Sequence, residues 1–151
     1  MGCKENDQIT TFILLRHAEK GNDGTEDPDL SLPGIERAER LKLLLRETEI
    51  NGIYATQFKR TKNTVAPLAL AKNLDIQSYE SFKAEEIEKM LDKHQGGTVV
   101  ICGHSNNIPW TANLLLGKET YKDYTENEYG IMLILSVVKK GKVAKVTRLD
   151  W

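Results

Sequence analysis

Residues 9–17 read ITTFILLRH, an apolar and β-branched run that ends in an arginine and a histidine. The run lacks the strict alternation of apolar and polar residues that is typical of a half-exposed strand. It therefore predicts a strand over residues 9–15 that is buried on both faces. A second run, GGTVVICGH at 96–104, has the same form and also ends in a histidine. Strands buried on both faces are typical of parallel sheets covered by helices, so the two runs favour an α/β fold.

The remaining sequence alternates between helix and strand patterns. Apolar residues at helical spacing predict helices within residues 32–50, 57–74, 84–94 and 107–117, and short strands are expected at 52–56 and 75–79. Residues 130–151 predict a β-hairpin that turns across KKGK. This order predicts a layered α/β domain with a largely parallel sheet. No repeat or linker interrupts it, so we expect a single domain over 9–151 and a flexible N-terminal tail over 1–8.

Composition limits the classes of partner. The chain has 151 residues, 40% of them hydrophobic and 28% charged, and a formal net charge of −1. This balance is ordinary for a soluble globular domain and gives no support for a nucleic-acid-binding face. No apolar stretch is long enough to predict a transmembrane segment.

The two cysteines, Cys3 and Cys102, do not form the pattern of a disulfide framework. Cys102 lies in the apolar run TVVICG, where a small buried side chain is expected. Cys3 lies in MGCKEND, which is similar to the mature end of a bacterial lipoprotein after its signal segment is removed. A cytoplasmic location is expected, with a lipoprotein anchored through Cys3 as the alternative.

Basic residues follow three of the predicted strands. Arg16 and His17 end the first, His104 ends the second, and Arg60 lies just beyond the short strand at 53–55. In α/β sheets, ligands bind beyond the carboxyl ends of the strands. The segment GHSNN, residues 103–107, also leads into a predicted helix, whose N-terminus favours anions. Two arginines and two histidines at one edge predict a site for a phosphoryl group.

These side chains suit phosphoryl transfer without a cofactor. The planar guanidinium group binds phosphate oxygens in pairs and stays charged at any relevant pH. A neutral imidazole can attack phosphorus and hold the phosphoryl group covalently. Nearby arginines depress the pKa of such a histidine, which leaves its nucleophilic nitrogen unprotonated. The three histidines show no metal-binding spacing, so neither a metal nor another cofactor is expected.

Four segments, within residues 11–116, carry a family resemblance: LLRHAEK, DLSLPGIERAERL, IYATQFKRTKNTVAPLA and VVICGHSNNI. In order and context they resemble the signature segments of the histidine phosphatase superfamily, with Ala18 in place of the usual glycine after Arg-His. The resemblance implies the phosphoglycerate-mutase-like fold, a three-layer α/β/α sandwich with a mostly parallel central sheet.

The resemblance also implies roles for individual residues. His17 would be the nucleophile that becomes phosphohistidine. Arg16, Arg60 and His104 would bind the phosphoryl oxygens. Asn22, in the loop after His17, is expected to supply a further polar contact with the phosphate.

The general acid is less clearly indicated. Many members carry a glutamate between the Arg-Thr helix and the second histidine, where this chain offers Glu80, Glu85 and Glu86. Glu80 is the candidate because it is nearest the end of the predicted strand, although a solvated helix face is the alternative for each. Glu128 is a more distant candidate. The acid-phosphatase branch has an aspartate directly after the second histidine, where Ser105 stands here.

The segment between Thr64 and Thr98 is too short for the substrate cap of the mutase-type members, so an open shelf is expected. In this the chain resembles the small bacterial phosphohistidine phosphatases. The expected activity is a metal-independent phosphohydrolase, acting on a phosphoprotein (phosphohistidine) or a small phosphomonoester. A phosphate-binding regulatory module without catalysis and a phosphoglycerate-type mutase are the alternatives. Trp110 is expected in the core or at the mouth of the site, and His94 is expected to be structural.

Overall fold

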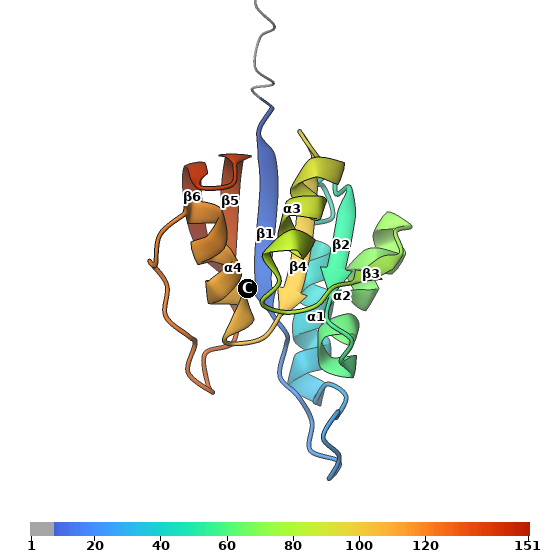
Figure 1. Cartoon of the computed structure of the whole chain (residues 1–151). Coiled ribbons are helices and arrows are strands. Elements are labelled where there is room, and N and C mark those ends of the chain that lie inside the picture. The colour runs from blue at the N-terminus through green and yellow to red at the C-terminus, as the bar shows by residue number, and fades with distance from the viewer. Residues whose placement is uncertain (1–7) are drawn as a thin grey trace, which may run out of the picture.

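The structure, a computed structural model, describes residues 8–151 as one six-stranded sheet with helices on both faces (Figure 1). The strands are β1 (Thr10–Arg16), β2 (Gly52–Ala55), β3 (Ile76–Ser78), β4 (Thr98–Gly103), β5 (Ile131–Lys139) and β6 (Lys142–Asp150). The helices are α1 (Leu32–Leu44), α2 (Lys59–Lys72), α3 (Ala84–Lys93) and α4 (Asn107–Leu116). Each predicted helix and strand is present, and the three-layer α/β/α prediction is confirmed.

The central strands are buried on both sides, as their unbroken apolar sequence predicts. On β1, Phe12 and Leu14 pack into the core that α3 and α4 cover, whereas Ile13 and Leu15 pack into the core beneath α1 and α2. All four side chains are at most 2% exposed. Burial of each such side chain contributes about 1.5–3 kcal/mol, so this strand is the centre of both cores.

The strand order β3-β2-β4-β1-β5-β6 creates a crevice between β1 and β4. From β3 to β1 the strands are parallel, and β5 and β6 are antiparallel. The chain leaves β1 through α1 toward β2, on one side, and leaves β4 through α4 toward β5, on the other. The connections that leave β1 and β4 therefore run toward opposite edges of the sheet, and the crevice between two such strands is where α/β sheets bind ligands. Two long loops, 17–31 and 117–130, extend past this edge (Figure 1).

Helix α1 begins next to the loop that follows His17, for local reasons. The Ser31 hydroxyl accepts a hydrogen bond from the Gly34 backbone N–H at 3.3 Å and so caps the helix, with Pro33 in its first turn. A Cβ at Gly34 would collide with the backbone of Glu19. Glycine is required there because α1 and the loop after His17 touch through their backbones.

The predicted tail over residues 1–8, and Cys3 with it, lies outside the described residues except for Gln8. Among residues 8–151, no helix has the length and apolar character needed to cross a membrane.

Candidate active site

The ends of β1 and β4 bring His17 and His104 together. Arg16 and Gly103 are register partners, and the His17 backbone N–H donates to the Gly103 carbonyl at 2.9 Å. The two imidazole rings that follow have centroids 5.5 Å apart and meet edge to face. They line an open cleft of about 520 Å³ together with Arg16 and Arg60. The sequence prediction that these four residues converge at one sheet edge agrees with this geometry.

His17 is held as a neutral imidazole with a defined tautomer. The ring is 5% exposed, and its Nδ1 lies 2.7 Å from the Ala18 carbonyl oxygen. A carbonyl can only accept, so Nδ1 carries the hydrogen and Nε2 carries the lone pair. Burial lowers the pKa of His17 to about 3, with further lowering by His104, Arg16 and Arg60. Nε2 forms no hydrogen bond with any described residue and is available as a nucleophile.

Ala18 itself is fully buried, with Leu30, Ala38 and Trp151 around it. Its backbone N–H donates to the Thr64 hydroxyl at 2.8 Å. The fold thus accommodates a methyl group at this position.

Arg16 is fixed by the loop before β5. One terminal nitrogen, Nη1, donates to the backbone carbonyls of Thr125, Glu126 and Glu128 at 2.9–3.1 Å. The guanidinium group also lies 4.0 Å from the centre of the Tyr129 ring. Its Nε is buried without a partner among the described residues. An unpaired buried donor beside His17 is available to an oxyanion.

Arg60 enters the cleft from the first turn of α2. Its guanidinium lies 4.5 Å from the centre of the Phe58 ring, and its Nη1 lies 4.0 Å from Asp27 Oδ1. Its Nε, like that of Arg16, is buried without a partner in the described chain. One unsatisfied guanidinium donor thus comes from the end of β1 and the other from the first turn of α2.

His104 is oriented through a pair of threonines. Its Nε2 lies 2.8 Å from the Thr56 hydroxyl, which is 2.9 Å from the Thr61 hydroxyl. Thr61 in turn donates to the carbonyls of Thr56 and Phe58, both at 2.9 Å. Since each hydroxyl has one hydrogen, Thr56 donates to Thr61 and accepts from His104 Nε2–H. The His104 Nδ1 is then unprotonated, and burial, followed by Arg60 and Arg16, lowers the pKa of this ring to about 4.

Asn107 and Tyr79 hold the turn between β4 and α4, and the sequence did not single them out. The Asn107 side-chain oxygen accepts from the His104 backbone N–H, and its Nδ2 donates to the Tyr79 hydroxyl at 2.9 Å. Tyr79 donates onward to the Cys102 carbonyl at 3.2 Å. A Cβ at Gly103 would collide with both side chains. In the sequence, Gly103 before the histidine and Asn107 at the end of GHSNN were the features that could have indicated this tight turn.

Three predicted residues do not line the cleft. Asn22 is exposed in the loop after His17. Glu80 forms an exposed ion pair with Lys83, although the next two residues, Ser81 and Phe82, do line the cleft. Glu128 contributes its backbone carbonyl to Arg16, while its carboxylate accepts from the Thr125 backbone N–H at 2.8 Å.

Five other polar residues line the cleft and were not predicted from the sequence: Lys20, Ser81, Ser105, Asn106 and Glu126. Glu85 and Glu86, the remaining acid candidates, lie in the first turn of α3 and are absent from this lining. Glu126 is the acidic residue of the cleft within the described chain.

His94, Cys102 and Trp110, the other residues that the sequence analysis discussed, lie outside the lining of the cleft. His94 Nε2 and the Tyr54 hydroxyl are hydrogen-bonded at 2.8 Å, away from the cleft. Cys102 is buried as predicted, and burial raises the pKa of its thiol. Trp110 packs partly against the core and also lines a groove beside the cleft. Across residues 8–151, no three His, Cys, Asp or Glu side chains cluster as metal ligands would.

Residues 12–85 match the model of the histidine phosphatase superfamily (branch 1). Over 74 residues the chain is 36% identical to phosphoserine phosphatase 1 of Hydrogenobacter thermophilus, an alignment that covers 45% of this chain and 35% of that enzyme.

Solved structures share the fold over nearly the whole chain. The protein histidine phosphatase SixA, complexed with tungstate, superposes with a TM-score of 0.75 at 14% identity, covering 93% of this chain and 96% of that one. A phosphoserine phosphatase of Entamoeba histolytica, in complex with 3-phosphoglyceric acid, gives 0.67 at 14% identity, covering 91% and 96%. At these identities the likeness establishes the fold, and it confirms the predicted fold class.

Proposed function

Because this chain belongs to the histidine phosphatase superfamily, we propose that it is a metal-independent phosphohydrolase that works through a phosphohistidine on His17. The observation that carries the proposal is the tautomer of His17. Its Nδ1–H is engaged by the Ala18 carbonyl, so Nε2 keeps its lone pair, and His17 shares the cleft with two arginines whose Nε–H groups are unpaired.

The proposed reaction has two displacements at phosphorus. In the first, His17 Nε2 forms a bond to phosphorus while the bond to the leaving group breaks, and the leaving group takes up a proton from solvent. In the second, water attacks the phosphohistidine and gives up a proton to solvent, and the P–N bond breaks to give inorganic phosphate and neutral His17. The guanidinium groups of Arg16 and Arg60 neutralise the charge on the phosphoryl oxygens in both steps, which is the part a metal plays elsewhere.

We assign the substrate to the class of phosphoramidates, phosphohistidine on a protein above all, with small phosphomonoesters as the second class. The carboxylate expected to protonate an ester oxygen, Glu80, is paired with Lys83 outside the cleft. The nitrogen leaving group of phosphohistidine is basic enough to need less help from an acid. The segment between α2 and β4 contains only β3 and α3 and adds no cap over the cleft, which is open. An open cleft also suits a bulky phosphoprotein.

A phosphate-binding module without catalysis is the second candidate. The placement of Glu80 outside the cleft favours it, because Arg16 and Arg60 can bind an anion without the acid that the resemblance implies.

One experiment separates the two. Phosphate release from an aryl phosphate and from phosphohistidine is measured with a chelator present, for the protein, for His17→Ala and for His94→Gln as a histidine control outside the cleft. Release that survives the chelator and the control but is lost in His17→Ala supports the phosphohydrolase. Equal release by His17→Ala and the protein contradicts the nucleophile. No release from any substrate, with vanadate binding that depends on Arg16, supports the binding module.

A further inference from the structure

A second groove, of about 480 Å³, adjoins the catalytic cleft. Phe82 and Asn106 line both hollows, so the two share a common border. A phosphoryl group bound at His17 occupies only part of the first. The part of a substrate that extends past Phe82 would therefore enter the second groove.

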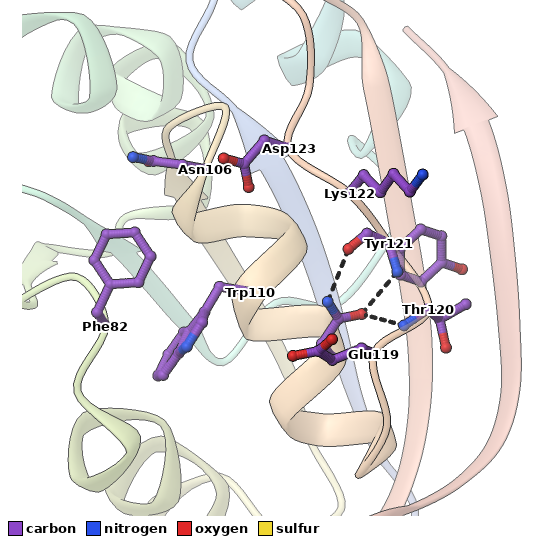
Figure 2. Close-up of a pocket in the computed structure, with 9 residues that line it drawn as sticks. Phe82, Asn106, Trp110, Glu119, Thr120, Tyr121, Lys122 and Asp123 are labelled. Atoms are coloured by element: carbon purple, nitrogen blue, oxygen red, sulfur yellow. Dashed lines mark hydrogen bonds between the residues drawn. The ribbon is translucent and has the colours of Figure 1, made fainter.

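One wall of this groove is aromatic. The rings of Phe82 and Trp110 lie edge to face with centroids 5.5 Å apart (Figure 2). Phe82 is 50% exposed, although its apolar ring would gain from burial. Its φ of 59° is in the left-handed region, which side chains other than glycine, asparagine and aspartate rarely adopt. A strained backbone thus holds an exposed aromatic ring at the border between the two hollows.

The opposite wall is the segment 119–123, and α4 fixes its position. The Asn113 side-chain oxygen accepts from the backbone N–H groups of Thr120 and Tyr121 at 3.0 and 2.9 Å. Its Nδ2 donates to the Tyr121 carbonyl at 2.9 Å. Figure 2 shows these three bonds tying the segment to the helix. The side chains on this wall are thereby presented on a held backbone.

The charge of this wall is negative. Glu119 and Asp123 both line the groove, and neither forms an ion pair with any residue in the described range 8–151. Lys122, the cation of the segment, extends its side chain away from the aromatic wall (Figure 2). Carboxylates facing aromatic rings form the usual environment for a cationic side chain, which gains both ion pairing and cation–π attraction.

We propose that this groove binds a lysine or arginine side chain near the phosphorylated residue of a polypeptide substrate. The proposal rests on the phosphohydrolase function above and narrows its substrate class. The two hollows differ in charge. In the cleft Arg16, Lys20 and Arg60 outweigh Glu126 and attract the phosphoryl group, whereas in the groove Glu119 and Asp123 outweigh Lys122 and attract a cation. A peptide that carries both charges fits both hollows at once.

The test uses phosphohistidine peptides with an alanine background. A single lysine is placed in turn at each of the four positions on either side of the phosphohistidine, and kcat/KM is measured at low and high salt. We expect the lysine to raise kcat/KM about five- to tenfold at one or more positions, and high salt to remove the gain. In the double variant Glu119→Gln, Asp123→Asn, the gain should fall below about twofold, while the all-alanine peptide is hydrolysed as before. Glu47→Gln, at an exposed site beyond α1, is the matched control and should retain the gain.

Two results would overturn the proposal: equal kcat/KM for all peptides, or a double variant that loses activity equally on every peptide. Failure of the phosphohydrolase function looks different, because then no peptide and no aryl phosphate releases phosphate. The groove is tested in that case by calorimetric binding of the same peptides to His17→Ala. Tighter binding of a lysine peptide that depends on Glu119 and Asp123 supports the groove, and equal binding of all peptides rejects it.

Discussion

The Nδ1 atom of His17 lies 2.7 Å from the carbonyl oxygen of the next residue, Ala18. Because this bond assigns the ring hydrogen to Nδ1, the opposite nitrogen is unprotonated before any substrate arrives. The same carbonyl would continue to accept from Nδ1–H once Nε2 carries a phosphoryl group. The hydrogen bond that selects the nucleophilic tautomer therefore also suits the covalent intermediate.

The fall of kcat/KM at low pH should not reflect protonation of His17. Burial lowers its pKa to about 3, so the nucleophile is already neutral throughout the range in which the protein is assayed. We expect kcat/KM to fall in acid with the ionisation of the substrate's phosphate, and to shift when a substrate of different phosphate pKa is used. A limb near pH 6.5 that is the same for every substrate would contradict this expectation.

Stability should fall in acid because of the same histidine. The unfolded chain binds a proton at His17 below about pH 6.5, whereas the folded protein does so only near its pKa of about 3, so acid favours the unfolded state. Between pH 8 and pH 5 this contributes about 2 kcal/mol to the loss of unfolding free energy. His17→Asn should reduce the loss by that amount in urea titrations at the two pH values. An unchanged difference between the two pH values would show that His17 titrates normally in the folded protein.

Thr56→Val should slow catalysis by leaving His104 without its orienting partner. The Thr56 hydroxyl is 2.8 Å from His104 Nε2, and valine has the same shape without the hydroxyl. We expect kcat to fall about tenfold, because a small misplacement of a group at the reacting phosphate is costly. Thr56→Ser retains the hydroxyl and should restore most of the activity. If Thr56→Val and Thr56→Ser are equally active, the hydroxyl has no positioning role.

Asn107→Ala should destabilise the turn that carries His104. The Asn107 oxygen accepts the His104 backbone N–H, and the side chain is fully buried. Its removal leaves a buried donor and the Tyr79 hydroxyl with one partner fewer, which costs about 1–3 kcal/mol. Asn106→Ala, one residue earlier and exposed, makes no capping bond and is the stability control. Chemical denaturation compares the two, and equal stabilities would exclude this role for Asn107.

Glu80→Gln should leave phosphate release within about twofold of the unchanged protein, since loss of an exposed ion pair costs at most about 1 kcal/mol. Its carboxylate pairs with Lys83 and is 62% exposed, away from the cleft. The measurement uses an alkyl phosphate, whose strongly basic oxygen leaving group is sensitive to loss of an acid. A loss greater than tenfold would restore Glu80 as the general acid.

The fold could be predicted because its signals are local. The unbroken apolar runs of β1 and β4, and the helical spacing between them, fix burial and element type through neighbouring residues alone. The convergence of His17 and His104 could also be predicted. Parallel strands of similar length end at one sheet edge, and the register of Arg16 with Gly103 follows from that rule.

The surroundings of the cleft could not be predicted in the same way, because they depend on loops. Nothing in the spacing of the sequence indicates that the carbonyls of 125–128 turn toward Arg16, more than 100 residues away. For Glu80 and Asn22, the resemblance identified a plausible residue type in the right segment. The direction of each side chain was decided by how the chain leaves β3 and β1.

The sequence by itself thus predicted the α/β architecture, the family resemblance and the convergence of Arg16, His17, Arg60 and His104 at one sheet edge. Hydrophobic periodicity and strand-end motifs depend on a few neighbouring residues, so they do not depend on the conformation of the loops. Only the tertiary structure decided the tautomer of His17, the threonine relay behind His104 and the acidic, aromatic groove beside the cleft. Each of these depends on hydrogen bonds and packing between segments that are distant in sequence, whose geometry exists only after the sheet has formed.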